Sequence, residues 1–388
     1  MSDAPEAARP TIARGLEGVV LCETKIAEVD GTNGRLTIQG YDIRELAGKA
    51  SFEEVAFLLW HGSLPTEAEY SALRAEMAAA RALPDATVDL LKAISSESTG
   101  MHAVRAAAGT LSVGEESVDS LDITLARKRA ARLLAKMPVI VGNYWRFRQG
   151  LPDIEVDPSA SVSETLLHLI KGEKPDPAIA EALDAYLVAV IEHGLNASTF
   201  VGRCIISTDS DMVSALTGAI GGLKGPKHGG VPGPVLDMLE DIGTPENADA
   251  WIRKHLADGK RVMGFGHRIY KVRDPRAQVL SDAADKLAGE GGDRRLHELV
   301  KAVEDTTVRV LAEIKPGRDL YANVELYAAL ILHAVGIPSE LFTPVFAVGR
   351  TAGWTAHMVE QLEDNRLIRP NSYYTGPKGK TFIPRNER

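Results

Sequence analysis

Apolar residues recur every three or four positions along most of the chain, which is the spacing of one helix face. In residues 51–60 this spacing places Phe52 and Val55 on the same side. Ser51 precedes the run and Glu54 stands three positions later, a pairing typical of the capping box at a helix start. The segment is therefore predicted to be a helix that begins after its serine.

The same start signal occurs twice more, at Thr66 with Glu69 and at Ser161 with Glu164. An apolar helical run also opens at Asn323-Val324-Glu325. Helical spacing continues through other long segments, so we expect further helices at residues 176–193, 211–221, 244–257, 275–288 and 294–314.

Strand signals are confined to the N-terminal part of the chain. Residues 19–29 and 36–39 have the pattern of two short strands and are separated by the turn sequence DGTNG, which predicts a short hairpin or meander. Alanine is frequent and aromatic residues make up only 5% of the chain, which favours close helix packing over a sheet core. The predicted fold class is all-α with a short N-terminal β-hairpin.

The helical pattern is interrupted most strongly by a loop rich in glycine and proline at residues 221–233. Such residues break regular structure and permit bends. A second break follows at residues 336–338, Gly-Ile-Pro. A chain of 388 residues is long enough for about two to three domains, and these breaks are candidate boundaries.

Bulk composition narrows the class of protein. Hydrophobic residues are 45% and charged residues 25%, which is ordinary for a globular protein. A net charge of −9 argues against a general binder of nucleic acid or membrane surfaces, because these need a basic footprint. Cys22 and Cys204 stand far apart, so neither a disulfide framework nor a zinc site is predicted. We see no apolar signal segment and no run of about 18 apolar residues, and we expect a cytoplasmic protein.

Candidate chemistry begins in residues 262–276, VMGFGHRIYKVRDPR. Glycines on both sides of one phenylalanine let the backbone approach a ligand closely, and His267 follows directly. Asp274 is predicted to cap a helix that starts at Pro275. Arg276 then lies in the first turn, where the free N–H groups and the helix dipole favour a negatively charged ligand. A carboxylate ligand would suit this place; the alternative is a surface turn whose His and Arg meet only water.

Two further segments favour the functional interpretation. Residues 224–233, KGPKHGGVPG, form a flexible loop that carries His228, and Glu325 stands at the start of an apolar helix. Two loop histidines and one carboxylate are the groups needed for acid-base chemistry at a carbon next to a carbonyl.

The motifs GPKHGG, GFGHRIYKVRDPR, NVE and FAVGRTAGWTAH occur here in one order that resembles the citrate synthase family. The likeness is greatest to the shorter bacterial and archaeal type, which includes 2-methylcitrate synthases, and it covers essentially the whole chain. The resemblance implies a two-domain helical homodimer whose smaller domain closes over a cleft. It would divide the chain into a large domain in two parts, 1–222 and 337–388, and a small domain, 223–336, with a C-terminal tail that embraces the partner.

The resemblance also implies the reaction, which is condensation of acetyl-CoA with oxaloacetate to citrate and CoA, without metal or other cofactor. Glu325 matches the family's base, His228 the donor to the thioester oxygen, and His267 the group that polarises the keto carbonyl. The residues that match the oxaloacetate site are His193, Asn196, Arg276, Arg350 and Arg369, the last contributed from the neighbouring subunit. Contacts with CoA are expected from Lys227, Arg261, Gly264, Lys271 and Arg273, although solvated surface charge is the alternative for each of these cations.

The chain departs from the family pattern at three positions. Glu325 replaces the usual aspartate and lengthens the proposed base by one methylene, Gly194 replaces an acidic residue after the histidine, and Lys227 replaces a leucine or methionine. These differences are typical of a divergent paralogue and leave three functions open. They are citrate synthase, 2-methylcitrate synthase acting on propionyl-CoA, and a non-catalytic homologue that binds acyl-CoA or a dicarboxylate.

Overall fold

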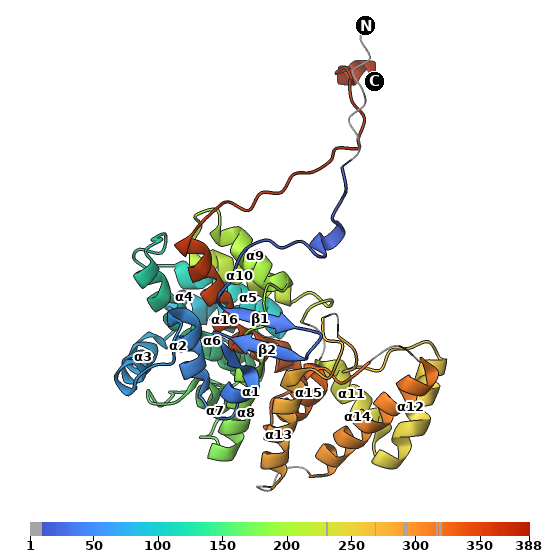
Figure 1. Ribbon diagram of the computed structural model, residues 1–388. Coiled ribbons are helices and arrows are strands. Elements are labelled where there is room, and N and C mark those ends of the chain that lie inside the picture. Colours follow the sequence, from blue (N-terminus) through green and yellow to red (C-terminus); the bar gives the residue numbers. More distant parts are fainter. Residues whose placement is uncertain (1–9, 230–231, 268, 290–293, 316, 318–319) are drawn as a thin grey trace.

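The computed structural model describes residues 10–229, 232–267, 269–289, 294–315, 317 and 320–388, and within them the protein is built from packed helices (Figure 1). The predicted all-α class is therefore confirmed, with one small sheet beside the helices. The first part of the chain contains α1 (Ile43–Leu46), α2 (Phe52–His61), α3 (Glu67–Ala80), α4 (Asp85–Ile94), α5 (Gly100–Gly109), α6 (Ile123–Arg148), α7 (Val162–Lys171), α8 (Pro177–Val190), α9 (Ala197–Ile206) and α10 (Met212–Leu223).

The second part of the chain is also helical, and short 3-10 turns connect or end several helices. Its helices are α11 (Pro232–Ile242), α12 (Ala248–Ala257), α13 (Pro275–Gly289), α14 (Arg294–Ile314), α15 (Val324–Ala334) and α16 (Phe342–Glu363). The 3-10 turns lie at Arg14–Leu16, Thr110–Ser112, Pro245–Asn247, Ser339–Leu341 and Arg385–Glu387.

The predicted capping boxes are present at the starts of α2, α3 and α7. At α2 the Ser51 hydroxyl accepts from the Glu54 N–H at 3.3 Å, and the Glu54 carboxylate accepts from the Ser51 N–H at 2.7 Å. Two backbone donors that lack helical partners are satisfied reciprocally in this way. These helix starts are confirmed because the signal that encodes them is local.

The hairpin is shorter than predicted at its first strand. β1 (Ala27–Asp30) pairs antiparallel with β2 (Arg35–Ile38), and β2 pairs with the short β3 (Tyr41–Asp42). Residues 19–26 do not form strand, and Val20 is 88% exposed. The prediction of a strand from residue 19 was wrong because β2 offers only four residues as a ladder partner.

The helix predicted for residues 176–193 also ends early, at Val190. Gly194 adopts φ +62°, a left-handed conformation that favours glycine, and Asn196 then caps α9 by accepting from the Thr199 N–H. His193 therefore lies in the loop between two helices rather than at a helix end.

The helices α11 to α15 lie together at one end of the molecule, and the sheet lies beside their junction with the rest (Figure 1). The long helix α16 packs against α6, α9, α2 and α8 in the core, where Trp354 and Arg350 are among its buried side chains. The predicted break at 221–233 contains residues 230 and 231, which lie outside the described residues.

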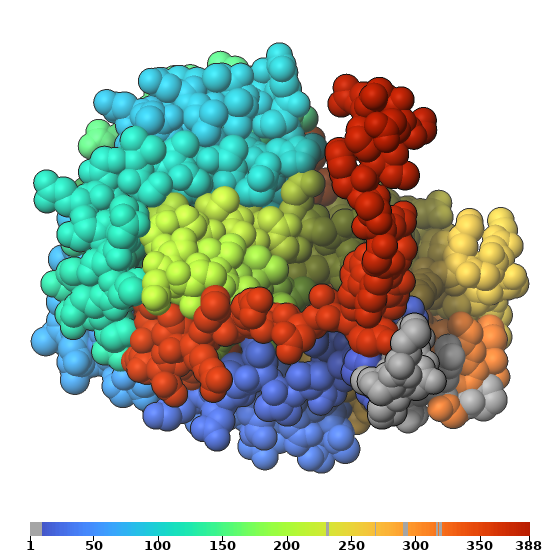
Figure 2. Space-filling model, turned by 90° about the horizontal axis from the view of Figure 1, so that it is seen from above, coloured from blue at the N-terminus to red at the C-terminus, as the bar shows by residue number. Residues whose placement is uncertain are grey.

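Both ends of the described chain leave the helical body on the same side (Figure 1). The segment after α16 first crosses one face of the molecule, where it lies over other elements, and then projects away (Figure 2). Large apolar side chains on these two segments are exposed, among them Val20 at 88% and Phe382 at 78%. Among the described residues, no helix is both long enough and apolar enough to cross a membrane.

Candidate functional site

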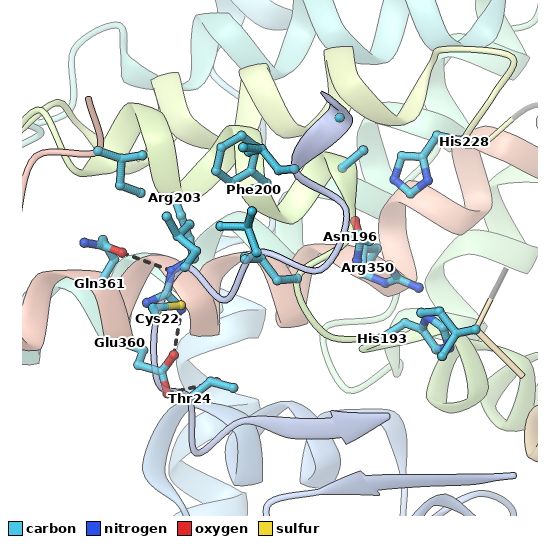
Figure 3. Close-up of a pocket in the computed structure, with 18 of the residues that line it drawn as sticks. Cys22, Thr24, His193, Asn196, Phe200, Arg203, His228, Arg350, Glu360 and Gln361 are labelled. Atoms are coloured by element: carbon cyan, nitrogen blue, oxygen red, sulfur yellow. Dashed lines mark hydrogen bonds and ion pairs between the residues drawn. The ribbon is translucent and has the colours of Figure 1, made fainter. Parts of the chain in front are cut away.

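A cavity of about 1960 Å³ brings together residues that are far apart in the sequence. It is lined by the α8–α9 loop, the loop after α10, the starts of α13 and α15, the middle of α16 and parts of both terminal segments. Figure 3 shows His193, His228 and Arg350 gathered around one part of it, with Asn196 close by. The residues predicted as catalytic or oxaloacetate-binding all line this cavity, namely His193, Asn196, His228, His267, Arg276, Glu325, Arg350 and Arg369.

His267 is held by the backbone that follows it. Its Nδ1 accepts from the N–H of Ile269 at 3.0 Å and from the N–H of Tyr270 at 3.1 Å. Burial lowers the pKa of His267 to about 4, and Arg276 contributes in the same direction. The neutral ring must therefore carry its hydrogen on Nε2, which makes that nitrogen a donor. Such a donor can polarise a carbonyl oxygen.

His193 is packed against the same loop. Its Nε2 lies 3.3 Å from the Tyr270 hydroxyl, and its ring meets the ring of His267 edge-on with centroids 5.4 Å apart. Burial, followed by the charge of Arg276, holds the pKa of His193 well below its usual value. His193 is therefore neutral and can exchange hydrogen bonds with a ligand without adding charge.

His228 is oriented by Ser198, a residue that the sequence analysis did not single out. The Ser198 hydroxyl lies 2.8 Å from His228 Nε2, donates to Asn196 Oδ1 at 2.8 Å and accepts from Trp354 Nε1 at 3.0 Å. A hydroxyl has one hydrogen, so Nε2 of His228 must be the donor to Ser198 in this arrangement. Burial lowers the pKa of His228 to about 4, and the ring is neutral near pH 7.

Arg276 and Asp274 form a buried bidentate ion pair at the start of α13. Arg276 Nε and Nη2 donate to the two carboxylate oxygens at 3.0 and 2.7 Å. Asp274 also accepts from the N–H of Arg276 at 3.0 Å and from the N–H of Val324 at 3.3 Å. Asp274 thus caps α13 as predicted. Its carboxylate accepts from the N–H of Arg276, so this N–H is not left to bind the anionic ligand that the sequence had suggested.

The positive charge of Arg276 keeps the Asp274 carboxyl ionised. Burial opposes ionisation of Asp274, but the neighbouring guanidinium holds the pKa of this carboxyl below its usual value. The contact to Val324 also ties the start of α13 to the start of α15, which carries Glu325.

Arg350 lies in the middle of α16 and is only 2% exposed. Its Nε donates to the Val190 carbonyl at 2.6 Å, and its guanidinium lies over the Phe346 ring at 4.8 Å from the centroid. Burial lowers the pKa of Arg350 to about 10, so the side chain remains a cation at neutral pH. A buried cation that faces a cavity is suited to binding an anion.

Glu325 is the second residue of α15, and its N–H donates to Asn323 Oδ1 at 3.0 Å. Burial raises the pKa of its carboxyl to about 7, against the opposing charge of Arg276. A base works best when its pKa is near the ambient pH, so this carboxyl is suited to proton abstraction at neutral pH.

The positions predicted to meet CoA are less concentrated. Lys227 lines the cavity, whereas Arg261, Gly264, Lys271 and Arg273 do not. Arg273 Nε and Nη2 are paired with the Glu304 carboxylate at 2.6 and 2.8 Å. A phosphate contact by Arg273 would therefore compete with an existing ion pair.

The outer end of the cavity is built from both terminal segments. Glu360 Oε1 accepts from the N–H of Lys25 at 2.8 Å and from the Thr24 hydroxyl at 3.1 Å, and Glu360 Oε2 pairs with Arg203 at 2.7 Å (Figure 3). Arg369, in the C-terminal segment, is exposed and also lines the cavity. Within the described residues, His, Cys, Asp and Glu side chains do not group in a way that could hold a metal ion.

Comparison with known proteins identifies relatives across nearly the whole chain. The model of the family described as "Citrate synthase, C-terminal domain" matches residues 15–371. The citrate synthase of Haloferax volcanii is 42% identical, with 97% of this chain and 99% of that protein covered. The 2-methylcitrate synthase of Mycobacterium tuberculosis is 37% identical, with 95% and 91% covered.

A solved structure with the same fold is that of the citrate synthase from Thermoplasma acidophilum in ternary complex with carboxymethyl coenzyme A and oxaloacetate. It superposes with a TM-score of 0.88 at 30% sequence identity, and the alignment covers 97% of this chain and 100% of that one.

Proposed function

The chain belongs to the citrate synthase family, and on that premise we propose that it condenses acetyl-CoA with oxaloacetate to give citrate and CoA. The observation that carries this proposal is one cavity that brings together a carboxyl with a pKa of about 7, neutral imidazoles and buried guanidinium groups, namely those of Glu325, His228, His267, Arg276 and Arg350. Each group has a distinct role in forming a carbon–carbon bond next to a thioester.

Oxaloacetate binds first in the proposed order. Arg276 and Arg350 bind its two carboxylates, for which a planar guanidinium offers parallel N–H donors. His193 and Asn196 complete the polar lining. The Nε2–H of His267 donates to the keto oxygen and makes the keto carbon more electrophilic.

Condensation then begins at the methyl group of acetyl-CoA. Glu325 removes one methyl proton while His228 donates a hydrogen bond to the thioester oxygen, on which the enolate charge develops. The methylene carbon attacks the keto carbon, and the electrons of the carbonyl bond pass to the keto oxygen. That oxygen takes up a proton, which balances the one that Glu325 removed, and the product is citryl-CoA. Water then cleaves the thioester, which releases citrate and the CoA thiol.

The donor role of His228 requires a change in the hydrogen bonds around it. Ser198 donates to Asn196 in the free protein, which leaves the hydrogen of His228 on Nε2. We propose that Asn196 turns toward bound oxaloacetate, so that the Ser198 hydroxyl donates to Nε2 instead. The neutral ring then carries its hydrogen on Nδ1, the nitrogen left for the thioester oxygen.

We further propose that residues 223–336 act as a small domain that closes over the cavity, and that the active form is a homodimer. The exposed apolar side chains on both projecting terminal segments support association with a second copy, since large exposed apolar surfaces are costly in water. In the single chain Arg369 lines the cavity of its own subunit, and we propose that in the dimer it reaches the site of the partner instead. A cytoplasmic location stays a prediction from the sequence, and we propose a role in the tricarboxylic acid cycle because citrate is the proposed product.

The test is release of the CoA thiol by purified protein with oxaloacetate and either acetyl-CoA or propionyl-CoA, with a control that lacks oxaloacetate. We expect kcat/KM to be higher with acetyl-CoA. A higher value with propionyl-CoA would assign the chain to the 2-methylcitrate synthases, a reading that the Mycobacterium tuberculosis relative supports. One methylene is worth only about 1–3 kcal/mol, so both values must be measured. Binding of acyl-CoA without thiol release would indicate a non-catalytic homologue.

A further inference from the structure

The turn of the N-terminal hairpin packs against the loop that carries His267. This turn, residues 31–34, connects β1 to β2. The Gly31 carbonyl accepts from the N–H of Lys271 at 2.8 Å, and this bond joins two segments that are 240 positions apart in the sequence. The hairpin therefore contacts the His267 loop directly through its backbone.

Two glycines make this approach possible. A Cβ atom at Gly31 would lie 2.8 Å from Ile269 Cγ2 and closer still to the Ile269 carbonyl. Gly34 has φ +62°, and a Cβ atom there would lie 2.5 Å from Val272 Cγ2. Real side chains do not approach this closely, so the turn fits the loop only because both positions lack a side chain.

Of the two contacted residues, Ile269 orients the histidine directly, and Val272 lies two positions after Tyr270 in the same loop. Nδ1 of His267 accepts one hydrogen bond from the N–H of Ile269 and another from the N–H of Tyr270. Displacing Ile269 would therefore weaken the bonds that fix both the direction of the ring and the position of its hydrogen.

The turn itself is braced. The Asp30 carboxylate accepts from the N–H groups of Thr32 and Asn33 at 3.0 Å each and from the Asn33 side-chain amide at 2.7 Å. On the following strand Leu36 and Ile38 are fully buried. A turn that is tied internally and anchored in the core can hold a neighbouring loop in place.

We propose that the hairpin turn positions the imidazole of His267, with Gly31 and Gly34 as positioning residues that keep Ile269 and Val272 in place. This inference rests on the proposed function, in which His267 polarises the keto group of oxaloacetate. It adds a part of the chain that lies outside the cavity to the requirements of that step.

The test compares Gly34→Ala with Gly40→Ala. Both glycines have positive φ, so both variants carry similar backbone strain, but a Cβ atom at Gly40 meets nothing within 4 Å. We expect Gly34→Ala to lower kcat by about 10- to 100-fold, because displacement of a catalytic group by about 1 Å costs up to that much. Gly40→Ala keeps the wild-type kcat. Gly31→Ala behaves as Gly34→Ala does.

A second readout separates positioning from general destabilisation. The infrared stretching frequency of the keto carbonyl in bound oxaloacetate reports its polarisation directly. We expect it to move toward the value for free oxaloacetate in Gly34→Ala and to stay unchanged in Gly40→Ala. Adding Val272→Ala removes the methyl group that Gly34→Ala would strike, so the double variant Gly34→Ala/Val272→Ala should recover both kcat and the carbonyl shift.

Each result decides between the possibilities. Equal behaviour of Gly34→Ala and Gly40→Ala, or a loss of kcat with no change in carbonyl frequency, overturns the inference while the proposed function stands. A wild-type protein that neither turns over nor shifts the carbonyl frequency overturns the proposed function itself. If alanine at Gly31 or Gly34 prevents folding, Asp30→Ala loosens the turn without adding atoms, and an unchanged carbonyl frequency in that variant also overturns the inference.

Discussion

Two buried carboxyl groups in different parts of the molecule have similarly raised pKa values but very different surroundings. Glu325 lines the cavity, and burial raises its pKa to about 7. Asp184 lies in α8 beside the starts of α2 and α7, and burial followed by the charge of Glu53 raises its pKa to about 8. Desolvation dominates in both places, so a raised pKa alone does not identify a functional group.

The partners of the two groups explain the difference. Asp184 accepts from the Phe52 N–H at 3.0 Å and from the Ser163 hydroxyl at 3.1 Å, and so connects the first turns of α2 and α7. The nearby Glu53 accepts from the Val162 N–H at 2.8 Å and from Arg74 at 2.6 Å. This cluster satisfies helix ends, whereas Glu325 faces a cavity large enough to admit substrate. Access to a ligand therefore distinguishes Glu325, the proposed catalytic carboxyl, from the structural carboxyl of Asp184.

The strongest test of this contrast is Glu325→Gln. The amide keeps the size of the side chain but cannot take a proton, so we expect kcat to fall by about 10²- to 10⁴-fold, the usual contribution of a general base. Oxaloacetate affinity, measured by calorimetry, should remain nearly unchanged, because the proposed mechanism assigns that binding to Arg276 and Arg350. Turnover that survived the substitution would remove Glu325 from the mechanism.

Arg350→Lys tests whether the cavity arginines bind the dicarboxylate. Lysine preserves the charge but loses the planar fork, and we expect oxaloacetate affinity to weaken by about 10- to 100-fold with little change in acyl-CoA affinity. The matched control is Arg146→Lys, since Arg146 is also buried but donates to the Pro152 carbonyl away from the cavity. Equal losses in both variants would indicate a structural role for Arg350.

The sequence predicted those features whose signals are local. Ser51 with Glu54 encodes a helix start within four residues, and Asp274 before Pro275 encodes another; both are present. The long helix α6 was not predicted because Pro138 lies inside it and the charged Arg129 is buried by distant parts of the fold. Apolar residues near position 20 resemble a strand, but strand formation needs a partner that is set by tertiary structure.

The site divides in the same way. The loop histidines and Glu325 were found from motifs and the family resemblance, and they line one cavity. The link from Ser198 to His228 joins residues that are 30 positions apart, which no local pattern predicts. The sequence also did not show that Asp274 accepts from both the N–H and the guanidinium of Arg276, donors that were expected to meet a ligand. The Asn-x-Ser pattern after His193 was the available signal for Ser198, but only the fold shows what the hydroxyl contacts.

The pH dependence of kcat/KM gives a third test of the contrast. Glu325 must be ionised to act as a base, and its pKa is about 7. We therefore expect kcat/KM to reach a plateau above pH 7 and to fall by up to about tenfold for each pH unit below it. The pKa values of His228 and His267 are about 4, so these residues should add no further step between pH 5 and 8. A profile that stayed flat from pH 5 to 8 would contradict the assignment of Glu325 as base.

The smallest expected effect comes from Asp184→Asn, which should alter stability and leave kcat unchanged. The folded-state pKa of Asp184, about 8, exceeds the ordinary value of 3.8, so the folded protein holds a proton that the unfolded chain releases between these pH values. Stability therefore falls as pH rises across that range, and asparagine, which resembles the protonated acid, removes the loss. We expect the free energy of unfolding to rise by about 1–3 kcal/mol at pH 8 and by less at pH 5, as measured by urea denaturation. An equal change in the free energy of unfolding at both pH values would show that Asp184 does not hold the proton. A loss of kcat would show that Asp184 and Glu53 contribute to activity, which contradicts a purely structural role for them.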